Sequence, residues 1–222
     1  MRVPQPAGHK GSLMWVQRLV ARRPDLAEAP LRAAGALAPG ARLEWVSPRE
    51  ADDRAEYRDA SFLAALGRSD LAPHLRAFWP ARGPQWDALA RAADGTVVLV
   101  EAKAHAAELG SSCAATSPAR EQISAALART RAALGAAPGA DWLTGYYQSA
   151  NRLAHLHFLR TECGVPARLL NVYFVGDHTV SGPETAAGWA APLATARAHL
   201  GLAADAEVPG LVTAFVPVGE LA

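Results

Sequence analysis

The segment from Gln85 to His105, QWDALARAADGTVVLVEAKAH, constrains the fold of this chain more than any other stretch. Asp94-Gly95 favours a tight turn, and the β-branched and apolar residues after it favour a strand. If a three-residue loop places Gly95 at positive φ, the pairing of the flanking strands puts Asp87 directly opposite Glu101. The segment therefore predicts an antiparallel hairpin.

The charged residues of this hairpin are expected to share one of its faces. Side chains alternate along a strand, so Glu101, Lys103 and His105 point one way, while Val100 and Ala102 point the other. Two carboxylates directly across a strand pair repel each other, and burying a charge without a partner is costly. A divalent cation bound by the carboxylates would remove this conflict.

An Asp followed by Glu-X-Lys on the neighbouring strand resembles the signature of the PD-(D/E)XK nuclease superfamily. The motif stands here as Asp87 and the tripeptide EAK at 101–103, and Trp86 replaces the proline that names it. The resemblance implies that Asp87, Glu101 and the Ala102 carbonyl bind Mg²⁺, or Mn²⁺ in its place. It also implies that Lys103 positions or activates the attacking water.

Lysine is rare in this chain, which makes its presence in the motif informative. Of the 22 Lys and Arg residues, only Lys10 and Lys103 are lysines. Lysine is a compact charge whose pKa moves readily when it is desolvated, as a catalytic role requires. The alternative is an edge-strand lysine that extends towards solvent and pairs with Glu101 for structural reasons.

A further acidic residue, Glu56, is a candidate for the same site. The sequence SPRE at 47–50 has the pattern of a capping box, which predicts a helix that begins there and ends near Leu66. Glu56 falls at the margin of the buried face of this helix. The resemblance implies that the helix before the sheet contributes one more carboxylate, whereas most helical glutamates are exposed to solvent.

The remaining pattern predicts alternating helices and strands. Helices are expected over residues 12–23, 31–37, 117–135, 141–162 and 183–200, and strands over 43–46, 169–175 and 211–216. Residues 68–84 show no clear strand, although the αβββαβ core of the superfamily requires one there. We expect one α/β domain with a restriction-endonuclease-like core, in which helices flank a mixed central sheet. An N-terminal helical extension (1–46) precedes the nuclease-like core (47–176), and a C-terminal αβ extension (177–222) follows it.

Candidate substrate-binding residues lie mainly on the predicted helix 141–162. Its polar stripe recurs at the helical spacing i, i+3, i+4 and i+7 and consists of Gln148, Asn151, Arg152 and His155. Such a stripe either faces solvent or lines a groove for a nucleic-acid strand. His105 in the hairpin and Gln122 on the preceding helix are further candidates for phosphate contacts.

Composition limits the class of protein. The chain has 222 residues, of which 50% are hydrophobic, and a formal net charge of +1. It has no long apolar run and no signal-peptide pattern, so we expect a cytoplasmic protein without a membrane partner. Two separate cysteines predict neither a disulfide scaffold nor a zinc site. Frequent Ala, Arg, Gly and Pro suggest a bacterial source.

These observations favour a Mg²⁺-dependent nuclease that hydrolyses the phosphodiester bonds of DNA or, as the second choice, of RNA. A homodimer is compatible with this activity. One alternative is a catalytically silent nuclease fold that binds nucleic acid or a protein partner, because the near-zero net charge gives no global attraction to nucleic acid. A second alternative is a metal-dependent hydrolase of a smaller phosphate ester.

Overall fold

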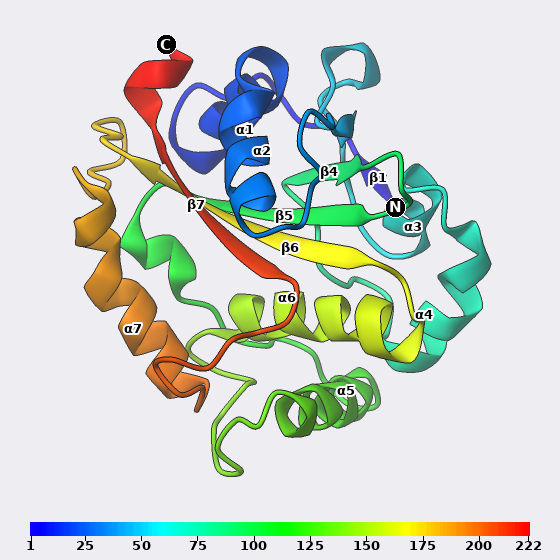
Figure 1. The fold of residues 1–222 in the computed structure, drawn as a ribbon. Coiled ribbons are helices and arrows are strands. Elements are labelled where there is room, and N and C mark those ends of the chain that lie inside the picture. Colours follow the sequence, from blue (N-terminus) through cyan, green and yellow to red (C-terminus); the bar gives the residue numbers. More distant parts are fainter.

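The predicted hairpin lies within a mixed five-stranded sheet in a computed structural model that describes residues 1–222 (Figure 1). Its strands are β4 (Ala88–Arg91) and β5 (Val97–Lys103). Ala88 pairs with Val100 and Arg91 with Val97, which is the register that the turn predicts. Gly95 has a φ of 85°, a conformation that a side chain would disfavour. The hairpin and its register are therefore confirmed.

Three further strands complete the sheet in the order β2-β4-β5-β6-β7. They are β2 (Glu44–Ser47), β6 (Ala167–Val175) and β7 (Leu211–Pro217). The pairs β2–β4 and β4–β5 are antiparallel, whereas the pairs β5–β6 and β6–β7 are parallel. Parallel neighbours need crossover connections, and helices provide them after β5 and after β6. The α/β class and the mixed sheet flanked by helices are thus confirmed.

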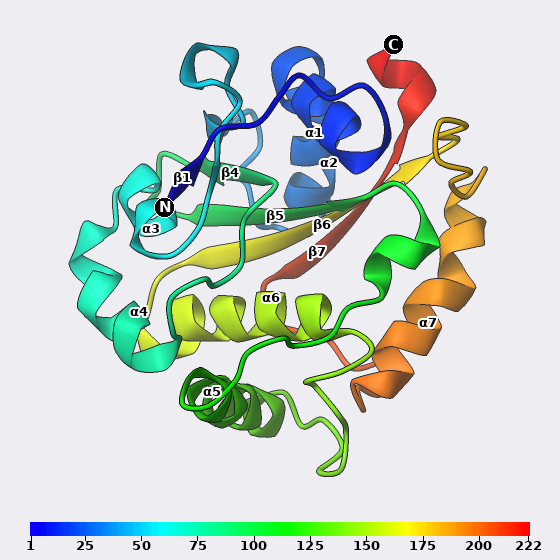
Figure 2. The same ribbon diagram turned by 180° about the vertical axis from the view of Figure 1, so that it is seen from behind.

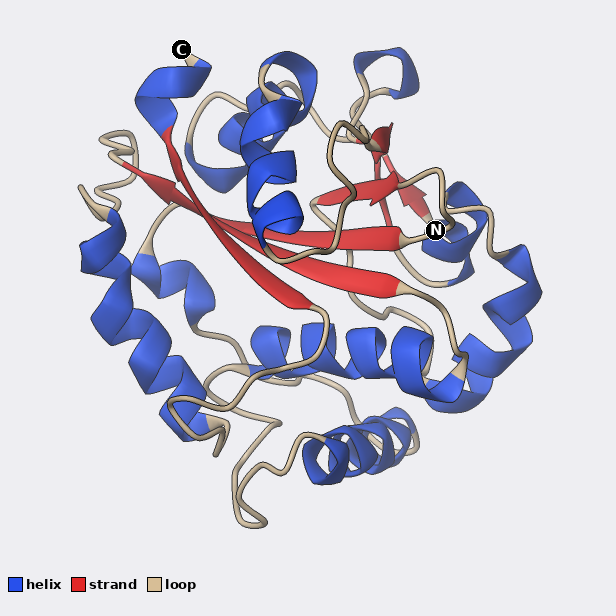
Figure 3. Cartoon of the chain, viewed as in Figure 1, coloured by secondary structure: helices blue, strands red, loops and turns tan.

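Helices cover both faces of the sheet (Figures 1 and 3). Helices α1 (Gly11–Arg22) and α2 (Pro24–Ala33) pack on one face. Helix α6 (Tyr147–His157) packs on the other, with α5 (Ala119–Ala133) outside it, as the reverse view in Figure 2 also shows. Helix α7 (Ala190–His199) flanks the sheet near β7.

Alternation along β5 divides the core between these two layers. Val97 and Leu99 belong to the cluster on the α6 side, whereas Val98, Val100 and Ala102 belong to the cluster under α1 and α2. Glu101 and Lys103 therefore point towards α6. The sheet places the two charged residues of the motif inside the layer between β5 and α6.

The helix predicted from the capping box is wrong. The segment forms one short 3₁₀ turn, Glu50–Asp52, and Asp53 and Arg54 then adopt a φ of 50° each, which a right-handed helix cannot continue. Glu56 instead lies in the two-residue strand β3 (Glu56–Tyr57), which pairs with β1 (Arg2–Val3). The local capping signal is overridden by pairing with the distant N-terminus.

Other differences concern element boundaries and the region before the hairpin. After α3 (Ala60–Ala65), residues 68–84 contain α4 (Ala72–Phe78) and no strand, and the antiparallel partner of β4 is β2. The predicted helix 31–37 lies earlier, in α2, because Pro24 ends α1 and at once occupies the first turn of the next helix. The predicted helix 141–162 begins only at Tyr147 and ends in a π-helical turn, Phe158–Glu162.

The predictions for α1, α5, β2, β6 and β7 agree with the structure to within a few residues at each end, whereas α7 begins seven residues later than predicted, after a 3₁₀ turn at Ala186–Trp189. None of the helices combines the length and apolar character needed to cross a membrane.

Candidate active site

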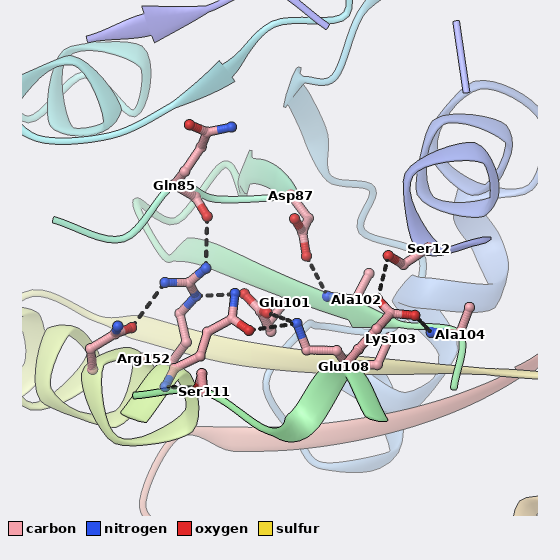
Figure 4. Close-up of polar contacts among 12 residues, drawn as sticks. Ser12, Gln85, Asp87, Glu101, Ala102, Lys103, Ala104, Glu108, Ser111 and Arg152 are labelled. Carbon is pink, nitrogen blue, oxygen red and sulfur yellow. Dashed lines mark hydrogen bonds and ion pairs between the residues drawn. The ribbon is translucent and has the colours of Figure 1, made fainter. Parts of the chain in front are cut away.

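Asp87 lies immediately before β4, at the point where the chain separates from β5 (Figure 4). Trp86 pairs with Tyr57 instead of continuing the β4–β5 ladder. The Ala102 N–H, which faces this gap, donates a hydrogen bond of 2.7 Å to Asp87 Oδ2. The carboxylate therefore takes the position of a missing strand partner. Asp87 lies beside the EAK tripeptide, although it does not pair with Glu101 in the ladder as the hairpin register predicted.

Glu101 is buried between two cations. Its Oε1 accepts a hydrogen bond from Lys103 Nζ, and its Oε2 accepts one of 2.5 Å from Arg152 Nε. Glu101, Lys103 and Arg152 are only 6%, 8% and 4% exposed. Charges at this depth persist only when they are paired, so the three side chains form one interdependent unit.

Lys103 has a second partner on the covering helix. Its Nζ donates a hydrogen bond of 2.9 Å to Gln148 Oε1. The first turn of α6 is itself anchored, because the Gln148 N–H donates to Ser111 Oγ at 2.7 Å. Lys103 is thus neither an exposed edge-strand lysine nor a freely mobile one.

Arg152 connects α6 to the segment before β4. Its Nη2 donates to the Gln85 carbonyl at 2.7 Å, and its Nη1 donates to Asn151 Oδ1 at 2.9 Å. The guanidinium also lies 4.7 Å from the centre of the Trp86 ring, a cation–π contact. Trp86, in the place of the motif proline, therefore forms a platform for Arg152.

The polar stripe of α6 points inward. Asn151, Arg152 and His155 are buried, and Gln148 is half-buried. His155 does not reach the carboxylates, because it is enclosed by the rings of Phe62, Phe78, Trp79 and Trp86. The stripe therefore divides into a part that serves the charged cluster and a histidine that belongs to the core.

Glu56 reaches the same region from a different element than predicted. It is 7% exposed, and its Oε2 accepts hydrogen bonds from Gln85 Nε2 at 2.5 Å and from Gln5 Nε2 at 3.2 Å. It forms no salt bridge. Burial raises the pKa of Glu56, and the nearby Glu101 charge raises it further against the effect of Gln85.

The two motif carboxylates experience opposite environments. Burial and the charge of Glu101 raise the pKa of Asp87 well above its ordinary value, against the attraction of Lys103. Burial would also raise the pKa of Glu101, but Arg152 and Lys103 overcome that effect and hold it below its ordinary value. Glu101 is therefore the stable anion of the pair, whereas Asp87 lacks a cation of its own.

Two predicted substrate contacts lie outside this cluster. Gln122 Nε2 donates to the carbonyls of Arg76 and Ala77, so it links α5 to the end of α4. His105 caps a short 3₁₀ turn together with Glu108, whose carboxylate accepts the His105 N–H at 3.2 Å. Both residues have structural partners where they lie.

The cluster also contains residues that the pattern did not single out. Gln85 contacts both Arg152 and Glu56, and Asn171 and Tyr173 lie opposite Glu101 and Lys103 in the parallel β5–β6 register. A polar Asn171 within the apolar run LLNVYFV of β6 was an available signal, because it shares a face with Tyr173. Gln85 offered no such signal, since its role depends on contacts with distant residues.

The donor set suits a hard divalent cation. Asp87 and Glu101 supply carboxylate oxygens and Ala102 a carbonyl, and each carboxylate oxygen has lone pairs beyond those used in its present hydrogen bonds. No group of three His, Cys, Asp or Glu side chains is arranged to hold a metal ion. Mg²⁺ in proteins commonly uses one or two carboxylates, with water and substrate phosphate completing its shell.

The chain matches no protein-family model, no curated protein and no solved structure. The assignment of a function therefore depends on the geometry and charge of this cluster alone.

Proposed function

We propose that this protein is a divalent-metal-dependent nuclease that hydrolyses phosphodiester bonds of nucleic acid, with DNA as the expected substrate. The observation that carries the proposal is the cluster itself. Asp87 lies immediately before β4 and Glu101 lies on the adjacent strand β5, Lys103 is in direct contact with Glu101, and Asp87 has no counter-ion. This is the arrangement expected of a PD-(D/E)XK site.

A purely structural role explains only part of the cluster. Glu101 with Lys103 and Arg152 forms a satisfied ion network. Asp87 and Glu56 add two further carboxylates whose burial raises their pKa values and which no cation balances. An uncompensated buried carboxyl lowers stability, and such groups concentrate at functional sites. Their presence supports a site that receives positive charge from outside the chain.

Lys103 is well placed to act on a substrate. An ammonium group has three N–H donors, and Glu101 and Gln148 accept two of them. The third remains for a water or a phosphate oxygen. Glu101 fixes the position of the ammonium and Arg152 fixes Glu101, so Lys103 is preorganised to orient that water or to stabilise charge on the phosphate.

A cation held by Asp87, Glu101 and the Ala102 carbonyl would supply Lewis-acid polarisation of the phosphate and a bound water of lowered pKa. The order of elements is compatible with the same proposal. An αβββαβ order is obtained from α1 and α2, strands β2, β4 and β5, helices α5 and α6 and strand β6, with β3, α3 and α4 inserted between β2 and β4.

A cleavage assay tests this function directly. Plasmid, linear duplex and single-stranded DNA, together with RNA, are incubated with Mg²⁺ or Mn²⁺ and, separately, with excess chelator. We expect metal-dependent cleavage that falls by about 10²-fold or more in Asp87→Asn and in Lys103→Met. Lys10→Met is the matched control, because Lys10 is the other lysine of the chain and is exposed. Absence of cleavage by the wild type, or undiminished cleavage by Lys103→Met, refutes the proposal.

One observation favours a catalytically silent nucleic-acid or protein-binding module instead. Both Glu101 oxygens already have cationic partners within the chain. Calorimetric titration with Mn²⁺ separates the two functions. The nuclease requires binding by the wild type that Asp87→Ala abolishes, whereas the silent module requires no binding at this site in either protein.

A further inference from the structure

A cleft of about 450 Å³ begins at the charged cluster and lies between α6, α7 and strands β6 and β7. Glu101, Lys103 and Arg152 form its inner end. Its walls are mainly aliphatic and include Leu153, Leu169, Leu193, Leu200, Leu202 and Leu211. A cavity of this volume accommodates a ligand about the size of one nucleotide.

The cleft runs from solvent to the charged cluster. Ala194, Ala198 and Thr213 line its outer part and are exposed, whereas the inner end is closed by the buried side chains of Glu101 and Arg152. A ligand that enters from the outside therefore brings its leading group to Lys103.

Helix α7 contributes three alanines to the lining besides Leu193 and Arg197, and these short side chains leave space for the cleft. Ala194, Ala196 and Ala198 line the cleft, and Ala196 alone among the residues of α7 is fully buried. Figures 1 and 2 show α7 along the side of the molecule, whereas α6 lies directly against the sheet. Helix α7 thus forms one wall of the cleft, and its side chains do not fill the space.

The charges and polar groups of the lining define the ligand. Three cations, Lys103, Arg152 and Arg197, and one anion, Glu101, line the cleft. Glu101 balances only one of the two cations that it pairs with, and Arg197 donates only to backbone carbonyls, so the excess of positive charge favours an anionic ligand. Ser149, Asn171 and Thr213 add hydrogen-bonding groups along the walls. A simple alkyl chain would leave these groups unpaired, whereas a sugar and a base would use them.

We propose that the cleft binds one unpaired nucleotide of the strand that is cut, with its phosphate at Lys103 and its base between the aliphatic walls. This inference rests on the proposed nuclease function and names its substrate class. A base that is paired and stacked in a duplex cannot enter a cleft closed at its inner end, so the substrate is single-stranded or has an unpaired end.

Binding of a single nucleotide tests the cleft independently of catalysis. The probe is deoxythymidine 5′-monophosphate, titrated calorimetrically into the protein with chelator present. Ala194→Phe places a ring in the cleft, and Thr195→Phe is the matched control because Thr195 is exposed on the same helix and does not line the cleft. We expect binding by the wild type and Thr195→Phe, and binding at least tenfold weaker in Ala194→Phe.

Cleavage by the same three proteins provides the second measurement, with thermal unfolding to confirm that each is folded. We expect the wild type to prefer single-stranded DNA over blunt duplex. Ala194→Phe is expected to lose that activity at least tenfold, while Thr195→Phe retains it.

Cleavage without nucleotide binding, and with equal rates in both variants, overturns the cleft proposal while the nuclease function stands. Nucleotide binding without cleavage refutes the nuclease function and leaves the cleft as a nucleotide site. Tight binding of decanoate in place of the nucleotide assigns the cleft to alkyl carboxylates and overturns the proposal.

Discussion

Replacing the two motif carboxylates by their amides is expected to change stability in opposite directions. Asp87 has a raised pKa and no cationic partner, whereas Glu101 has a lowered pKa and two such partners. Asp87→Asn keeps an oxygen that can accept the Ala102 N–H. Glu101→Gln leaves Lys103 and Arg152 buried without their counter-ion.

The magnitudes follow from burial and from the pKa directions. Removing one partner of a buried ion network costs about 3–5 kcal/mol, which is the expected loss for Glu101→Gln. Below pH 3.8 Asp87 is protonated in both the folded and unfolded states, so it does not lower the free energy of unfolding. Above that pH the unfolded state loses its proton first, so the wild type loses about 1.4 kcal/mol per pH unit until the raised folded pKa is passed. Asp87→Asn escapes this loss and gains stability over the wild type as pH rises.

Urea unfolding followed by circular dichroism, with chelator present, measures both effects between pH 4 and pH 8. We expect the midpoint of Asp87→Asn to rise above that of the wild type with increasing pH, and that of Glu101→Gln to fall at every pH. Added Mn²⁺ is expected to stabilise the wild type and not Asp87→Asn, because a ligand that binds only the folded state raises its stability. Equal destabilisation by the two variants across the pH range would refute the reasoning.

Two further predictions concern α6. Burial lowers the pKa of His155 to about 3, so wild-type stability is fully present above pH 6.5 and declines as pH falls towards 3. At pH 5 the cost is about 2 kcal/mol, and the difference in unfolding free energy between wild type and His155→Phe is expected to shift by this amount between pH 7.5 and pH 5. Parallel pH profiles of unfolding free energy for the two proteins would contradict this prediction. Arg152→Lys keeps the charge but cannot maintain the contacts with Glu101, Gln85 and Trp86 together, so we expect a loss of about 1–2 kcal/mol in urea unfolding. An unchanged urea midpoint would show that the fork geometry of Arg152 is not needed.

The parts of the site that were predictable depend on local sequence. The turn at Asp94-Gly95 sets the register of β4 and β5, and alternation then places Glu101 and Lys103 on one face. The helical spacing of α6 correctly grouped Gln148 and Arg152, but spacing alone cannot tell whether a polar stripe faces solvent or a charged cluster.

The parts that were not predictable depend on contacts between distant segments. Glu56 is buried near the cluster, yet its strand exists because the N-terminal residues of β1 pair with it, and no local pattern reveals that pairing. The partner of β4 proved to be β2, about forty residues earlier in the chain, although the resemblance implied a strand between Arg68 and Pro84. Gln85 likewise acquires its role only through Glu56 and Arg152.

Locating a bound cation is the most direct test of the central claim, that Asp87, Glu101 and the Ala102 carbonyl form a metal site beside Lys103. Crystals grown with Mn²⁺ and measured at the manganese absorption edge would reveal the ion by its anomalous signal. We predict a peak about 2.0–2.3 Å from oxygens of both carboxylates, as six-coordinate divalent cations require. A well-ordered structure with Mn²⁺ bound elsewhere, and with Glu101 still paired only to Lys103 and Arg152, would contradict the account.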